Sequence, residues 1–186
     1  MLTTSGASDI DAAHVLSNGH IILSTEGDET IAGVSFLDGD LIEFDPVGGT
    51  ATFAFHESLF SGSADIDGVA VLANGNILLS TADAATLGGL TFGGGDIVEY
   101  NSQTDVASLF FSESLFTSGV VNVDGVSLLS NSNLVLTTTT NETLGGLTFR
   151  DGDLVEYNRT TGAATLYFDE DLFTAGAADV DAVSVR

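Results

Sequence analysis

The sequence predicts an all-β protein built from three copies of one repeat. Short motifs recur at a spacing of 56 or 57 residues, and apolar runs of strand length alternate with turn signals. Apolar residues nowhere recur at the three-and-four spacing of an amphipathic helix without a glycine or Asn-Gly interruption. Each copy holds four strand-like runs, so we expect three four-stranded antiparallel units in a single repeat domain over residues 1–186.

A short acidic motif opens each copy. An aspartate or asparagine is followed by an apolar residue and an aspartate, and the motif recurs after 56, 57 and 57 residues. Its polar residues are Asp9 and Asp11, Asp65 and Asp67, Asn122 and Asp124, and Asp179 and Asp181. We therefore place the repeats at about residues 9–64, 65–121 and 122–178, with a partial fourth repeat at 179–186.

The second copy shows the four expected strands. Two apolar runs flank Asn74-Gly75, a strong hairpin signal, because a type I′ turn needs positive φ at both central residues. A glycine-rich stretch leads to the third strand at 96–100, and a short turn leads to an aromatic fourth strand. In the third copy Ser132 stands where the second has Gly75, which we expect to cost about 1 kcal/mol because serine resists positive φ.

Tandem four-stranded meanders favour β-propeller-like blades, whose sheets pack face to face around an axis. A β-trefoil-like threefold monomer is the alternative. Propellers typically have about four to eight blades, so three blades would leave apolar faces in water. We therefore predict a homodimer of six blades related by a twofold axis. The partial repeat at 179–186 would pair with the partner's sheet or latch the ring.

Further motifs recur beside the acidic one. They read Leu-x-Asn-Gly-x-Ile-Leu-Leu-Ser-Thr, Gly-Gly-Leu-Thr-Phe and Asp-Gly-Asp-Leu-Val-Glu-Tyr. Together with the Asp-x-Asp motif, they resemble propeller-like tandem repeats of secreted bacterial proteins. The resemblance implies propeller blades and a place outside the cell. It implies no activity, because that family has no established one.

The charge of the chain excludes two classes of partner. It has 27 acidic residues, three arginines and no lysine, which gives a formal net charge of -24. Nucleic acids and anionic membrane surfaces are therefore not expected partners, because both require clustered cations on the protein. Self-repulsion at this charge is relieved by salt or divalent cations, which fits an extracellular setting.

The paired acids are the candidate site. Asp65 and Asp67 stand two residues apart at the head of a strand, so both carboxylates point to one face. Hard cations such as Ca²⁺ take several oxygen ligands. We therefore take the polar residues of all four motifs as candidate metal ligands, with Ca²⁺ as the ion. Alternatively, a strand-leading aspartate accepts backbone N–H bonds, which explains the recurrence equally well.

The sequence contains little that indicates catalysis. It has no cysteine, and His14, His20 and His56 lie in the first copy without a nucleophile elbow or a zinc-type His-Glu-x-x-His motif. We therefore predict a noncatalytic extracellular binding or assembly module that cations stabilise; whether it also binds a protein or a carbohydrate stays open. The alternative is a hydrolase or lyase that acts on a polysaccharide with acids in a central channel.

Overall fold

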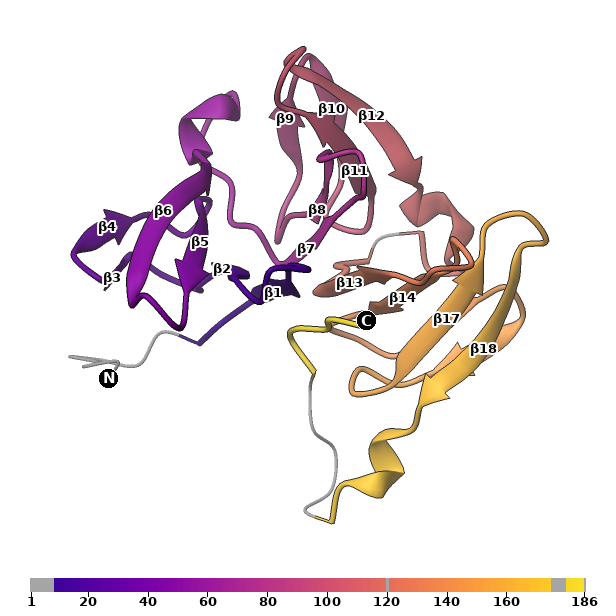
Figure 1. Cartoon of the computed structure of the whole chain (residues 1–186). Coiled ribbons are helices and arrows are strands. Elements are labelled where there is room, and N and C mark those ends of the chain that lie inside the picture. The colour runs from indigo at the N-terminus through magenta and orange to yellow at the C-terminus, as the bar shows by residue number, and fades with distance from the viewer. Residues whose placement is uncertain (1–8, 120, 175–179, 186) are drawn as a thin grey trace.

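The computed structural model describes residues 9–119, 121–174 and 180–185 and has an all-β fold (Figure 1). Three four-stranded antiparallel sheets are present, as predicted. Their strands in sheet order are β1 (Ala12–Val15), β2 (Ile21–Ser24), β5 (Leu41–Asp45) and β6 (Thr50–Phe55); β7 (Gly68–Val71), β8 (Ile77–Ser80), β11 (Ile97–Asn101) and β12 (Val106–Phe111); and β13 (Gly125–Leu128), β14 (Leu134–Thr137), β17 (Leu154–Asn158) and β18 (Ala163–Phe168). Each sheet forms within one repeat, which does not correspond to the β-trefoil-like alternative.

A short hairpin lies between the second and third strands of every sheet, where the sequence predicted only a glycine-rich connection. The hairpins are β3 (Glu29–Ile31) with β4 (Val34–Phe36), β9 (Ala85–Leu87) with β10 (Leu90–Phe92), and β15 (Glu142–Leu144) with β16 (Leu147–Phe149). At the tip of the second hairpin both Gly88 and Gly89 have positive φ, +53° and +81°, as a two-residue type I′ turn requires. The glycine pair therefore folds the segment back on itself.

The turn between the first two strands is a hairpin, as predicted, but its type differs. The Gly75 N–H donates to the Leu72 carbonyl at 2.9 Å, and the Leu72 N–H donates to the Asn76 carbonyl at 2.8 Å. Gly75 has φ +85°, whereas Asn74 is not among the residues with positive φ. The expected type I′ turn is therefore wrong: a three-residue loop with one left-handed residue connects the strands. In the third repeat Ser132 holds this position with φ +66°.

Neighbouring sheets pack face to face through two apolar cores. One core joins the first repeat to the second, and the other joins the second to the third. Short 3₁₀ turns follow the last strand of each sheet: η1 (Glu57–Leu59), η2 (Glu113–Leu115) and η3 (Glu170–Leu172). The phenylalanine after each of the first two turns reaches the next repeat, where Phe60 forms a β-bridge to Leu87 and Phe116 one to Leu144. Both phenylalanines are buried, so they help to join neighbouring repeats.

The first strands of the three sheets lie at the centre of the molecule (Figure 1). β7 contacts β1 on one side and β13 on the other. The C-terminal segment, residues 180–185, lies between β13 and β1. Ser127 of β13 accepts the Val185 N–H at 3.0 Å, and Ser184 accepts the Val15 N–H of β1 at 3.1 Å. Three inner strands and this segment therefore surround the axis, while the described sheets do not close a ring.

Several recurring acids have structural roles. Asp96 accepts the Gly93 N–H at 2.9 Å and the Glu113 N–H at 2.8 Å, which ties the start of β11 to η2. Asp40 and Asp153 make the same pair of bonds in the other repeats. Backbone capping therefore explains the recurrence of this aspartate.

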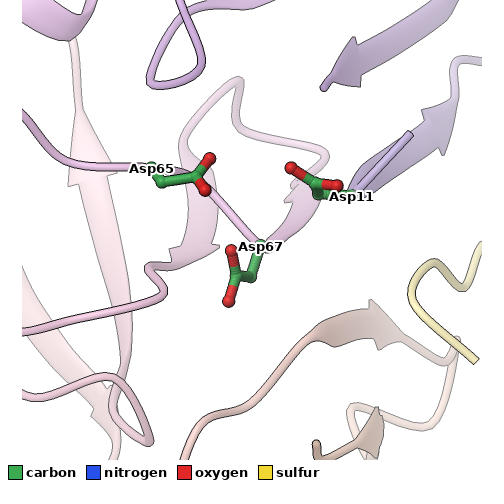
Figure 2. A group of neighbouring side chains, drawn as sticks. All are labelled: Asp11, Asp65 and Asp67. Atoms are coloured by element: carbon green, nitrogen blue, oxygen red, sulfur yellow. The ribbon is translucent and has the colours of Figure 1, made fainter. Parts of the chain in front are cut away.

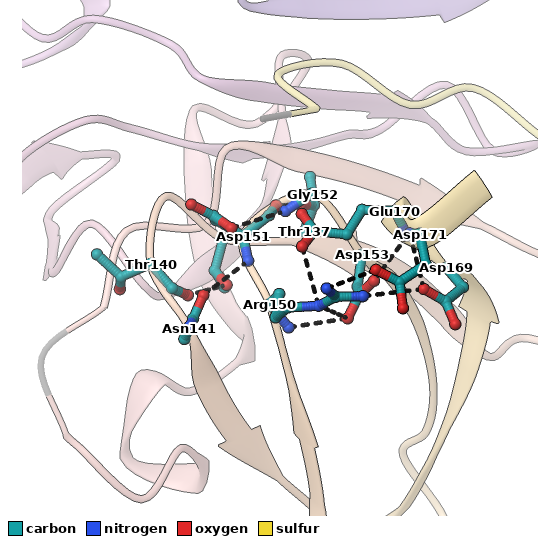
Figure 3. A network of polar contacts seen from close by, with 11 residues as sticks. Thr137, Thr140, Asn141, Arg150, Asp151, Gly152, Asp153, Asp169, Glu170 and Asp171 are labelled. Atoms are coloured by element: carbon teal, nitrogen blue, oxygen red, sulfur yellow. Dashed lines mark hydrogen bonds and ion pairs between the residues drawn. The ribbon is translucent and has the colours of Figure 1, made fainter. Parts of the chain in front are cut away.

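The third repeat carries an ion-pair network around Arg150 (Figure 3). Its guanidinium lies 2.9 Å from the buried carboxylate of Glu170, 3.0 Å from Asp169 and 2.8 Å from Asp171. These pairs raise the pKa of Arg150, and Arg150 lowers the pKa of Asp171.

No helix in the described part of the chain is long and apolar enough to span a membrane.

Candidate functional site

The Asp-x-Asp motifs meet at one end of the central axis. In each of the three repeats the motif directly precedes the inner strand, and a repeated backbone bond fixes its first residue. The carbonyls of Asp9, Asp65 and Asn122 accept N–H bonds from Glu26, Ala82 and Thr139, at 3.1, 3.1 and 3.2 Å. Each bond links the motif to the residues that follow the second strand. The repeat thus places the motif at an equivalent point of every blade.

An acidic pocket of about 260 Å³ opens between these motifs. Residues from all three repeats and from the C-terminal segment line it: Asp9, Asp11, Glu26, Asp65, Asp67, Asp124, Thr139 and Asp181. Six of the eight predicted ligands are therefore brought together. Such convergence cannot be read from the motif spacing alone, because it depends on how the blades are arranged.

Three carboxylates lie closest to one another. Asp11, Asp65 and Asp67 each offer an oxygen, and these oxygens lie within 4.8 Å of one another. Asp11 and Asp65 point toward each other, and Asp67 lies between them (Figure 2). Asp65 and Asp67 come from one motif, as predicted from their two-residue spacing, whereas Asp11 comes from the neighbouring repeat. A cation held here would therefore bridge two blades.

Burial and mutual repulsion disfavour ionisation of these groups. Burial, followed by the charge of Asp67, raises the pKa of Asp11 to about 7. The same two causes raise the pKa of Asp65 to about 7. Burial raises the pKa of Asp67 to about 6, although the hydrogen bond from Asn122 opposes this shift. A divalent cation would favour the ionised forms, because its charge offsets both causes.

Unpaired oxygens are present in the cluster. Within the described part of the chain, the buried atoms Oδ2 of Asp11 and Oδ1 of Asp65 accept no hydrogen bond. Buried carboxylate oxygens normally accept bonds, so these atoms fit a site that takes a proton or a hard cation. The set of donors is oxygen only, which suits Ca²⁺ or Mg²⁺ better than a soft metal.

The remaining predicted ligands have different positions. Asn122 is not among the residues that line the pocket: its side-chain amide donates to Asp67 Oδ2 at 2.7 Å and so holds a neighbouring carboxylate. Asp179 lies outside the described residues. Glu26 and Thr139 were not predicted, although both follow the recurring second strand at equivalent positions. Their alignment with each other was the available signal, but Ala82 in the second copy hid it.

The histidines lie away from the acidic pocket. The ring of His20 lies 2.6 Å from Glu43, in the place where Asn76 bonds Glu99 in the next repeat. His56 stacks on Phe53 with ring centroids 4.1 Å apart. Burial lowers the pKa of His14. None of the three lines the pocket, so the arrangement supplies no histidine base beside the acids.

Comparisons with known proteins show no family for the chain. No family model and no curated protein matches the chain. Among solved structures, one titled YCF48 bound to D1 peptide matches at a TM-score of 0.47 and 8% identity over 92% of this chain and 43% of that one. An auxiliary nutrient binding protein from Bacteroides thetaiotaomicron matches at a TM-score of 0.47 and 10% identity, over 88% of this chain and 32% of that one.

An aldose sugar dehydrogenase from Streptomyces coelicolor matches at a TM-score of 0.44 and 12% identity, over 83% of this chain and 46% of that one. The chain therefore spans less than half the length of each of these three proteins. Similarity at this level assigns the chain neither a family nor an activity.

Proposed function

We propose that this chain is a noncatalytic extracellular binding or assembly module of propeller-like blades, whose acidic pocket binds a hard divalent cation such as Ca²⁺. The observation that carries the proposal is the approach of Asp11, Asp65 and Asp67, whose oxygens lie within 4.8 Å of one another across two repeats. Ca²⁺ takes about six to eight oxygens, and further carboxylates of the same pocket can add to these three.

Three properties of the chain support a cation rather than another ligand. Self-repulsion at a formal net charge of -24 opposes folding, so a bound cation would stabilise the folded chain more than a neutral ligand would. Burial of the three carboxyls creates a cost that a cation can offset. The bridging position between the first and second repeats also gives the ion a structural role, because it would join two blades.

The extracellular assignment rests on the composition and on the resemblance of the repeat to secreted tandem repeats. Calcium at millimolar concentration outside cells can occupy sites of modest affinity. The six-bladed homodimer predicted from the repeat count is a competing proposal for the partner of this chain, because it would require segment 180–185 to leave its contacts with Ser127 and Val15.

A polysaccharide hydrolase or lyase is the second candidate, and one observation favours it. A carboxyl with a pKa near 7, as for Asp65, is suited to donate a proton beside an ionised neighbour. The catalytic hypothesis predicts that Asp65→Asn abolishes release of reducing ends from a polysaccharide. The binding hypothesis predicts that neither the wild-type chain nor the Asp65→Asn variant releases reducing ends from a polysaccharide.

Titration calorimetry with CaCl₂ at constant ionic strength tests the cation proposal. We expect saturable binding to the wild-type chain and no detectable binding to the double variant Asp11→Asn, Asp65→Asn. Asp28→Asn is the matched control, because Asp28 is exposed and does not line the pocket. Equal binding by the double variant and the control would refute the proposal.

A further inference from the structure

The C-terminal segment occupies the place of a fourth inner strand. Its sequence, Val-Asp-Ala-Val-Ser-Val, resembles the Val-Asp-Gly-Val-Ser-Leu of β13 and the two residues before it. A Cβ built on Gly68 would lie 3.2 Å from Val126 of the next repeat, and one built on Gly125 would lie 3.3 Å from Val183. Val183 thus packs on the third repeat as Val126 packs on the second.

The third repeat has an uncovered apolar face, whereas the equivalent faces of the first and second repeats are covered by the next repeat. The face of the first repeat packs on the second, and that of the second packs on the third. Phe60 and Phe116 are therefore only 6% and 3% exposed, whereas the equivalent Phe173 is 42% exposed. Within the described residues, no β-bridge like that from Phe60 to Leu87 is made by Phe173.

The first repeat has the opposite apolar face uncovered. Ile10 is 48% exposed, although the equivalent Ile66 and Val123 are each 0% exposed because they pack on the preceding repeat. Ile31 and Phe44 are also only partly buried, while their counterparts in the other two repeats are buried. The two uncovered faces are the two halves of the same recurring interface, and segment 180–185 lies between their sheets at the axis.

We propose that the wedge between the third and first repeats is a docking surface for the outer three strands of a further copy of this repeat. These strands would add to segment 180–185, whose backbone pairs with no strand in the described structure, just as β8 pairs with β7. The added hairpin would meet Phe173 as β9 meets Phe60, and the added 3₁₀ turn would meet Ile31.

The occupant is identified by continuity with the two existing interfaces. Each exposed apolar residue of the wedge has buried counterparts whose contacts define what must cover it. The arrangement gives four positions around the axis. A six-bladed homodimer differs, because it requires the first and third repeats to separate and segment 180–185 to leave its contacts with Ser127 and Val15.

Binding of a peptide with the sequence of residues 130–173 tests the docking surface. We expect one peptide to bind each 186-residue chain, measured by fluorescence anisotropy of the labelled peptide, and a peptide of scrambled sequence not to bind. Phe173→Asp and Ile10→Asp, one on each wall, should each weaken binding at least tenfold. Leu166→Asp is the matched control: Leu166 is 44% exposed, close to the 50% of its counterpart Leu109 in the covered second repeat, and should leave binding within twofold.

A second measurement does not depend on a free peptide, which could aggregate. The same residues joined after Arg186 should protect the amide of Val183 from hydrogen exchange and raise the unfolding midpoint in urea. Binding that Phe173→Asp and Ile10→Asp leave unchanged would overturn the proposal. An attached segment whose amides stay unprotected would also overturn it, as would a stable homodimer of the wild-type chain that buries Phe173 and Ile10.

Discussion

Replacing Ser132 by glycine should stabilise the protein, and the structure gives the size of the effect. Ser132 has φ +66°, in the left-handed region where the equivalent residues are Gly19 and Gly75, with φ +88° and +85°. A residue with a Cβ pays roughly 1–2 kcal/mol there. Glycine also increases the conformational entropy of the unfolded chain, which lowers the free energy of unfolding by about 0.4–1 kcal/mol. The expected net gain for Ser132→Gly is therefore about 0.5–1 kcal/mol.

The reciprocal change is the control. A Cβ added at Gly75 would meet no atom within 4 Å, so Gly75→Ser should cost only the backbone strain, about 0.5–1 kcal/mol after the entropy correction. Urea denaturation of both variants, with equal slopes, measures these differences as shifts of the midpoint. A loss of stability in Ser132→Gly, or no loss in Gly75→Ser, would refute the assignment of strain to this turn position.

Three further predictions concern charge. Arg150→Leu introduces the residue found at the equivalent position of the first repeat and should lower the urea midpoint, because the buried Glu170 loses its partner. Arg159→Leu removes a guanidinium that lies 3.5 Å from the centre of the Phe110 ring and should lower the urea midpoint less. Without divalent cations, the stability of the folded chain should fall as pH rises from about 4 to about 7. The pKa values of Asp11 and Asp65, about 7, exceed their unfolded value of 3.8, so the folded chain binds more protons than the unfolded chain over this range. A melting temperature that rises between pH 4 and pH 7 would contradict the raised pKa values. Asp65→Asn should raise the melting temperature at pH 7.5 in the absence of divalent cations, while Asp28→Asn should leave it nearly unchanged; a lower melting temperature for Asp65→Asn would show that its charge is compensated without a cation.

The strand architecture could be predicted from the sequence because the repeat supplies three independent copies of each signal. The starts of β1, β7 and β13 are Ala12, Gly68 and Gly125, which reproduce the repeat spacing. The small hairpins were missed because their strands have only three residues each and Gly88-Gly89 is equally typical of a loop. The turn type was wrong because Asn-Gly also suits a three-residue loop in which only glycine has positive φ.

The candidate site could be predicted only in part. The motif spacing indicated that Asp65 and Asp67 share one face, and an oxygen of each lies within 4.8 Å of one of the other. That Asp11 from another repeat joins them depends on the packing of β1 against β7, which no spacing encodes. Asn122, predicted as a ligand, instead donates to Asp67 through its amide, a contact that requires the third repeat to lie beside the second.

Calcium dependence of thermal unfolding tests the central claim most directly. At pH 7.5, CaCl₂ at about 100 times its dissociation constant should stabilise the chain by about 2.7 kcal/mol beyond NaCl of the same ionic strength. The additional stabilisation should disappear in the double variant Asp11→Asn, Asp65→Asn and persist in Asp28→Asn. Equal effects of CaCl₂ and NaCl on the wild-type chain would mean that salt only screens its charge, and would contradict a cation site between the blades.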